Sequence, residues 1–127
     1  MDNSRFKFRA WDRSLKKFWY WGFLPVSEGA DIVFWQGPPT GTKGNMGRFK
    51  HSQSTGILDR HGKEMYEKDL VKEVDNENRI GIVEFEDGCF CWIVPSNQDA
   101  DEWSTYLYTL YNPEIIGNIY ENVDLLK

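Results

Sequence analysis

The stretch "STGILDRHGKEMYEKDLVKEV", residues 54–74, gathers the residue types that acid–base catalysis would need. It holds one histidine, five acidic and four basic residues around a few apolar positions. General acid–base catalysis needs two carboxylates at a set distance, and Glu64, Glu67 and Asp69 lie close in sequence. Lys63 and Lys68 stand beside them, which favours a solvated face over a catalytic pair. Asp69 can instead accept backbone N–H bonds at the tight turn before "LVKEV".

Metal binding and nucleophilic catalysis would fall to His51, His61, Cys89 and Cys91. Cys-x-Cys with two scattered histidines does not match the paired spacing of structural zinc sites, so the histidines are expected on turns. "GCFCWIV" is typical of a buried strand, in which both thiols pack as small hydrophobes without activation. Walker A, Rossmann and Gly-x-Ser-x-Gly patterns are absent. We expect the protein to have no catalytic residue, metal site or cofactor. We also expect that it is not an enzyme.

Residues 5–21 interleave basic and aromatic side chains, the combination that binds single-stranded nucleic acid by phosphate contacts and base stacking. A Gly-rich segment, residues 37–47, is expected to be an exposed loop that extends this basic stretch. The candidate nucleic-acid-binding residues are Arg5, Lys7, Arg9, Trp11, Lys16, Lys17, Lys43, Arg48 and Lys50. Strand alternation points most of the aromatics toward a core instead. Nucleic-acid binding therefore stays the alternative function.

The charge of the 127-residue chain is divided unevenly along its length. Residues 1–53 hold nine Lys/Arg and four Asp/Glu, a net +5, whereas residues 54–127 hold six and sixteen, a net −10. The overall charge of −5 disfavours nonspecific binding to nucleic acid or anionic membrane. Opposite half-charges, a 16% aromatic content and many strand edges favour a homo-oligomer. A different protein is the second partner that such a surface would suit.

The same chain shows no pattern typical of a membrane or secreted protein. No apolar run approaches the length that spans a bilayer, and no signal-peptide pattern begins the chain. Cys89 and Cys91 would lie on the same side of one strand, a spacing that suits free thiols better than a disulfide. These features predict a reducing, cytoplasmic setting.

Short strands with a turn every eight to twelve residues predict an all-β fold, a small β-barrel or two. "RFKFRAW" alternates Arg5, Lys7 and Arg9 on a wet face with apolar residues on the other. Asp87-Gly88 predicts a tight hairpin, and "WSTYLYTLY" a capped turn followed by a strand. The chain is expected to divide into a basic β portion, residues 1–53, and an acidic portion, residues 54–127. In the acidic portion a strand, a polar turn and a tight hairpin follow one another in an SH3-like order.

Three motifs in order, "RFKFRAWD", the 54–74 stretch and "EIIGNIYENVDLL", resemble the YopX family of phage and prophage proteins over nearly the whole chain. The resemblance implies a mostly β, cytosolic domain spanning residues 1–127, without catalytic residues to carry over. Family members usually have Gly where this chain has Lys68, which implies a turn residue with positive φ.

From the resemblance and the lack of a catalytic pattern we expect a phage-encoded, non-enzymatic binding or assembly protein that acts through protein–protein contacts.

Overall fold

The structure is a computed structural model that describes residues 7–27, 30–34, 47–73, 79–96 and 101–126, and the backbone alone for 23–27 and 30–34. Within these ranges the chain is mainly β, as predicted. The elements are β1 (Lys7–Asp12), β2 (Lys17–Ser27), β3 (Ala30–Phe34), β4 (Phe49–Leu58), β5 (Glu64–Tyr66), β6 (Asp69–Glu73), β7 (Ile80–Glu86), β8 (Cys89–Val94), β9 (Trp103–Tyr106), the 3-10 helix η1 (Leu107–Thr109), β10 (Pro113–Asn118) and the 3-10 helix η2 (Val123–Leu126). Neither helix in these ranges is long and apolar enough to cross a membrane.

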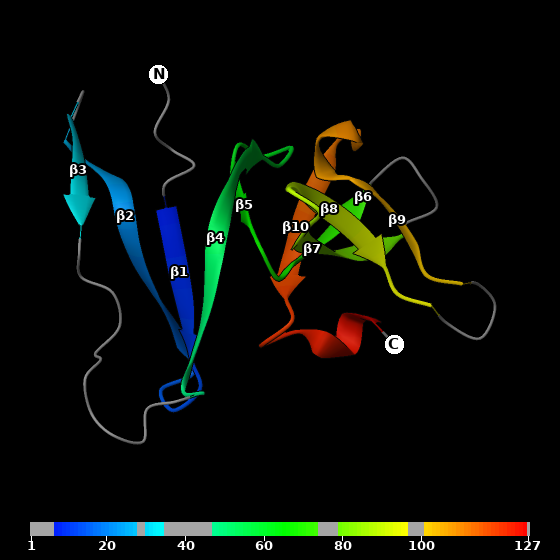
Figure 1. Cartoon of the computed structure of the whole chain (residues 1–127), viewed down its shortest axis with the longest axis horizontal. Coiled ribbons are helices and arrows are strands. Elements are labelled where there is room, and N and C mark those ends of the chain that lie inside the picture. Colours follow the sequence, from blue (N-terminus) through cyan, green and yellow to red (C-terminus); the bar gives the residue numbers. More distant parts are fainter. Residues whose placement is uncertain (1–6, 28–29, 35–46, 74–78, 97–100, 127) are drawn as a thin grey trace. The chain divides into compact units, whose positions relative to one another are not determined.

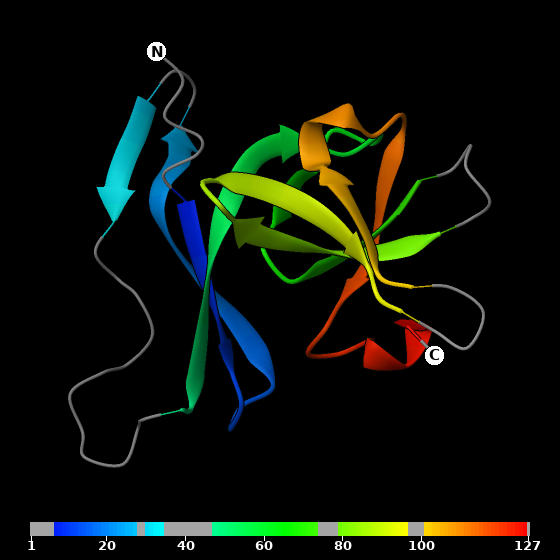
Figure 2. The same ribbon diagram turned by 45° about the vertical axis from the view of Figure 1, so that its right-hand side comes forward.

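The chain divides into two compact units, Met1–Ser54 and Thr55–Lys127. The division expected at residues 53/54 lies beside this boundary. One antiparallel sheet has the order β3-β2-β1-β4-β5, and the other has the order β10-β6-β7-β8-β9. β2 lies between β3 and β1 in Figure 1, and β8 lies between β7 and β9 in Figure 2.

Neither sheet closes on itself within the described residues, so the predicted β-barrel is wrong. In each strand order the first and last strands have no pairing with one another. The turn spacing in the sequence predicts how many strands form and which neighbours pair. Closure depends on hydrogen bonds between strands far apart in the chain, which local spacing does not reveal.

Several predicted turns are confirmed with their geometry. Asp87 and Gly88 both have positive φ, +51° and +81°, the conformation of the tight hairpin that joins β7 to β8. The segment after residue 102 begins as the predicted strand, β9, but its second half is η1. The predicted loop 37–47 and the turn at 75–78 fall outside the described residues, except for Gly47.

The prediction that Arg9 lies on a solvent-exposed face of β1 is wrong, because Arg9 is only 5% exposed. β1 lies between β2 and β4 in the sheet, and aromatic side chains of β2 pack on both of its faces. The Arg9 guanidinium lies 4.2 Å from the centroid of the Phe18 ring on one face. Phe8 stacks on Trp21 on the other face, with 5.8 Å between ring centroids. Alternation therefore predicted the strand but not its burial.

The core of the second unit is built around Trp92, which is fully buried. Its indole Nε1 donates a 2.8 Å hydrogen bond to the carbonyl of Val71 on β6. To reach β6 from β8, the ring passes over β7 at Gly81, the register partner of Val71. A Cβ at position 81 would lie 2.6 Å from Nε1 and 2.9 Å from the Ile93 carbonyl oxygen. The missing side chain of Gly81 is therefore what lets Trp92 join three strands.

Replacing Gly81 with Ala should destabilise the protein by about 1–3 kcal/mol, because the added methyl collides with both a ring and a backbone atom. Urea unfolding followed by tryptophan fluorescence measures the change. Glu86→Ala, an exposed position on the same strand, is the matched control and should stay within about 0.5 kcal/mol of wild type. Equal stability of the two variants would contradict this account of the core.

Candidate functional site

The structure distributes the candidate nucleic-acid-binding residues instead of gathering them. Arg5 and Lys43 lie outside the described residues. Lys7 is half-buried, Arg9 and Trp11 are buried, and Arg48 is engaged by a carboxylate, while Lys16, Lys17 and Lys50 are exposed. By register, Lys50 lies opposite Trp11 and Lys17 lies opposite Asp12. Lys17 and Lys50 therefore project from opposite faces of the sheet.

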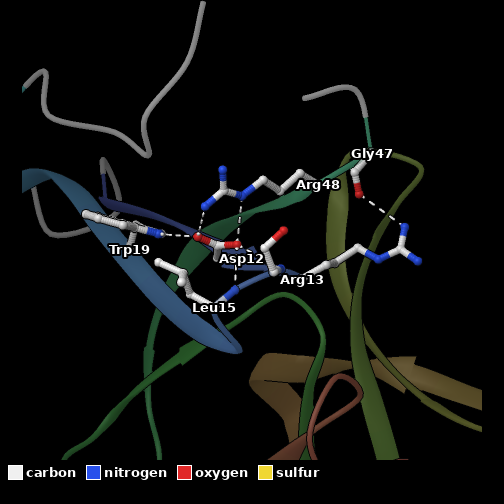
Figure 3. Close-up of polar contacts among 7 residues, drawn as sticks. Asp12, Arg13, Leu15, Trp19, Gly47 and Arg48 are labelled. Carbon is white, nitrogen blue, oxygen red and sulfur yellow. Dashed lines mark hydrogen bonds and ion pairs between the residues drawn. The ribbon is translucent and has the colours of Figure 1, made fainter. Parts of the chain in front are cut away.

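Asp12, at the end of β1, lies at the centre of a cluster of polar contacts in the first unit (Figure 3). Its carboxylate is fully buried and accepts a bidentate pair of 3.0 Å bonds from the Arg48 guanidinium. It also accepts the backbone N–H groups of Ser14 and Leu15 at 2.9 and 3.1 Å, and the indole N–H of Trp19 at 3.1 Å. One carboxylate thus fixes β1, β2 and the start of β4.

The residues between β1 and β2, 13–16, are called the β1–β2 turn below. Besides the bonds to Asp12, the Arg13 N–H donates to the Arg48 carbonyl at 2.9 Å, and its guanidinium donates to the Gly47 carbonyl at 3.1 Å (Figure 3). Lys16 has a φ of +57° and donates its N–H to the Asp12 carbonyl at 2.8 Å. Hydrogen bonds therefore tie the turn to the end of β1 and to the start of β4, while Leu15 is 56% exposed at its tip.

The hydrogen bonds from Arg48 are the largest cause that holds the pKa of the Asp12 carboxyl far below its ordinary value of 3.8. Burial acts in the opposite direction, and the N–H donors of the turn and of Trp19 lower the pKa further. The hydrogen bonds and the charge of Asp12 raise the pKa of Arg48 in turn. A carboxylate this acidic, with both oxygens engaged, organises structure and is unsuited to proton transfer.

The 54–74 stretch uses Asp59 in the same way. Its Oδ1 accepts the N–H groups of His61 and Lys63, both at 2.9 Å, and its Oδ2 accepts that of Ile115 on β10 at 3.2 Å. Burial, the largest single influence, raises the pKa of Asp59, but the three N–H bonds and the electrostatic interaction with His61 together outweigh it, so the pKa is lowered. The turn after β4 is thereby tied to the last strand.

The turn from β5 to β6 confirms two predictions. Asp69 is buried and its Oδ2 accepts the Tyr66 N–H at 2.8 Å, the structural role expected of it. Lys68 has a φ of +73°, the conformation that the expected Gly implied. Its N–H donates to the Val83 carbonyl at 2.7 Å, and its ammonium lies 2.5 Å from a carboxylate oxygen of Glu84. The lysine side chain thus pairs with Glu84 on β7, a contact that the implied Gly could not make.

The sulfur and imidazole side chains do not come together. Cys89 and Cys91 are free thiols, as predicted, but Cys89 is exposed at the hairpin end of β8 and does not pack in the core. His61 lies on a turn as expected, whereas His51 lies within β4 against the Trp21 ring. Within the described ranges no group of three or more His, Cys, Asp or Glu side chains could hold a metal ion.

An exposed aromatic surface covers β9 and η1. Tyr106 and Tyr108 stack in parallel, 5.7 Å apart, and are 50% and 71% exposed. Tyr111, just after η1, is 68% exposed. Trp103 is partly exposed too, but its ring packs edge-on against the buried Trp92, on the opposite face of β9 from Tyr106. No described strand pairs with the outer edge of β9. Much of the aromatic content therefore faces outward here, where only the density of Tyr in "WSTYLYTLY" could have signalled it.

A hollow of about 380 Å³ lies beside the tyrosine pair and is called the β9 hollow. Its lining residues are Glu86, Asp87, Cys91, Ser104, Thr105 and Tyr106. Burial, and then the charges of Glu86, Cys89 and Asp87, raise the pKa of the Cys91 thiol. The sequence patterns do not predict this hollow, because the hairpin carboxylates and β9 lie far apart until β8 pairs with both β7 and β9.

Comparison with known proteins assigns the two-sheet chain to a family. Residues 7–127 match the YopX protein family, and the chain belongs to it. The crystal structure of protein EF1440 from Enterococcus faecalis is similar, with 25% identity, a TM-score of 0.60, and coverage of 95% of this chain and 97% of that one. The yopX protein of Bacillus subtilis shares the fold at 19% identity, with a TM-score of 0.57 and 97% and 99% coverage. A search of the curated proteins finds no match.

Asp12→Asn should lower the thermal unfolding midpoint at neutral pH, because an amide NH₂ would then face the N–H donors of Trp19 and Arg48. Since the folded-state pKa of Asp12 lies below its unfolded value, the wild-type carboxylate stabilises the fold above pH 3.8, and this stabilisation is lost as the pH falls toward the folded pKa. Below pH 3.8 the stability of the variant should therefore depend less steeply on pH. Asp101→Asn, at an exposed position, should retain the wild-type profile, and matching profiles for all three proteins would contradict the role of Asp12.

Two substitutions at position 68 distinguish the effect of backbone strain on stability from the effect of the ion pair. Lys68→Gly and Lys68→Ala both remove the contact with Glu84, but only Gly adopts positive φ without strain. The Gly variant should therefore be more stable than the Ala variant by about 1 kcal/mol. Urea denaturation of the two variants measures the difference, and an Ala variant at least as stable as the Gly variant would exclude strain at this turn.

Proposed function

We propose that this protein is a non-enzymatic binding or assembly protein, encoded by a phage or prophage and acting in the host cytoplasm through protein–protein contacts. The exposed aromatic surface of β9 and η1 carries the proposal. Aromatic side chains are enriched where proteins bind one another, since they bury a large area at a small cost in side-chain entropy. The outer edge of β9 adds backbone groups that a partner could pair.

The arrangement of the charged groups supports a role without catalysis. The carboxylates of Asp12 and Asp59 hold backbone amides and have lowered pKa values. A general base needs a pKa near the working pH and an oxygen open to the substrate. These groups offer neither.

We further propose that residues 54–127 form an SH3-like portion. β6, β7, β8 and β9 follow one another as a meander, and β10 returns after η1 to pair with β6. This connectivity supports the SH3-like rhythm of the sequence, although the sheet is open. Such small sheets bind partners through aromatic surfaces and do not require a catalytic centre.

Self-association is the contact that we expect first, with a host or phage protein as a further partner. Light scattering after size-exclusion chromatography, over a concentration series, should show an oligomer that dissociates as salt is added, because salt screens opposite charges. A clean monomer at the highest concentration would contradict self-association.

Single-stranded nucleic acid is tested in parallel, by titrating labelled DNA and RNA at low salt, where electrostatic contacts are strongest. The exposed Lys16, Lys17 and Lys50 motivate this experiment. We expect no binding. Binding at low salt that weakens as salt rises, together with a monomeric protein, would favour the alternative function.

A further inference from the structure

The β9 hollow combines two chemical features that suit a particular kind of guest. Its rim carries the carboxylates of Glu86 and Asp87, both exposed, and no hydrogen bond or ion pair inside the described part of the chain engages them. Tyr106 also lines the hollow, and with Tyr108, which stacks on it outside the lining, it offers an apolar, π-electron-rich surface. A cationic group attached to an apolar side chain satisfies both features, by ion pairing and by cation–π contact.

The first unit presents such a guest at the tip of the β1–β2 turn. Leu15 is 56% exposed, and the next residue, Lys16, is an exposed cation with no ion pair among the described residues. The bonds of Asp12 to the N–H groups of Ser14 and Leu15 hold the turn in one conformation. A group already fixed in position loses little conformational entropy on binding.

The charges of the two portions of the chain complement each other, +5 for residues 1–53 and −10 for residues 54–127. A second copy therefore brings a basic surface to an acidic one. We propose that the β9 hollow receives the β1–β2 turn of a second copy, with that copy's Lys16 between Glu86 and Asp87 and its Leu15 against the stacked tyrosines. The inference rests on the proposed function and names the surface through which self-association occurs.

Charge reversal tests this contact. The hollow variant is Glu86→Lys with Asp87→Asn, because Asn tolerates the positive φ of position 87. The turn variant is Lys16→Glu. Each variant alone places like charges together and should weaken self-association by roughly tenfold or more, measured by analytical ultracentrifugation. Lys50→Glu makes the same charge change at an exposed position on β4 and should leave the affinity unchanged.

Mixing the two variants gives the sharpest result. The unchanged Lys16 of the hollow variant then meets the intact carboxylates of the turn variant, and the two reversed charges also attract each other. A mixture in equal amounts should associate at a concentration at which each variant alone is monomeric. Circular dichroism confirms that both variants are folded, and a mixture of folded variants that stays monomeric overturns the proposal.

The thiols supply an independent reading of the same contact. Cys91 lines the hollow and Cys89 does not, so alkylation of Cys91 in a Cys89→Ser background should slow as the protein associates. Alkylation of Cys89 in a Cys91→Ser background should not slow. If the wild type associates but the variants associate equally and Cys91 stays reactive, only this surface is wrong. A wild type that never associates contradicts the proposed function itself.

Discussion

The Asp12 carboxylate accepts five hydrogen bonds while fully buried, and the turn between β1 and β2 depends on it. A small β chain has many tight turns, and each turn leaves backbone N–H groups that the sheet ladder does not satisfy. Burying them without an acceptor costs free energy. Asp12, Asp59 and Asp69 solve this problem in the same way, each at the end of a strand or beside a turn. These turns are therefore held by hydrogen bonds from backbone N–H groups to buried carboxylates.

This use of the acidic residues separates two groups of carboxylates. The buried aspartates accept backbone N–H bonds, and the lowered pKa values of Asp12 and Asp59 show that their ionised form stabilises the fold. Exposed carboxylates such as Glu86 and Asp87 have no such commitment and lie beside outward-facing tyrosines. A surface of this kind is suited to recognising a partner. The hydrogen bonds that engage both oxygens of Asp12 also position Leu15 and Lys16 of the β1–β2 turn at the surface.

The tail motif of the chain shows how much local pattern predicts. Asn118 accepts the N–H groups of Tyr120 and Glu121 with its side chain, and its own N–H donates to the Asn122 side chain. Asn122 packs so closely on Gly117 that a Cβ there would lie 2.4 Å from the amide oxygen. These contacts span only a few residues, so the motif can specify them. The turn at Asp87-Gly88 is predictable for the same reason, whereas the positive φ of Lys68 was implied by the resemblance to the family.

The sequence alone determined the strands and most of their turns, because each depends on residues near one another in the chain. Its three motifs also determined the family, and the resemblance to that family implied the positive φ at position 68. Only the tertiary structure decided that Arg9 is buried, that Arg48 forms an ion pair with Asp12 and that Cys89 is exposed. It also decided that the sheets remain open and that Glu86 and Asp87 share a hollow with Tyr106. These outcomes depend on which strands become neighbours. A period of two reveals a strand, but burial of its faces depends on side chains that arrive from distant parts of the chain.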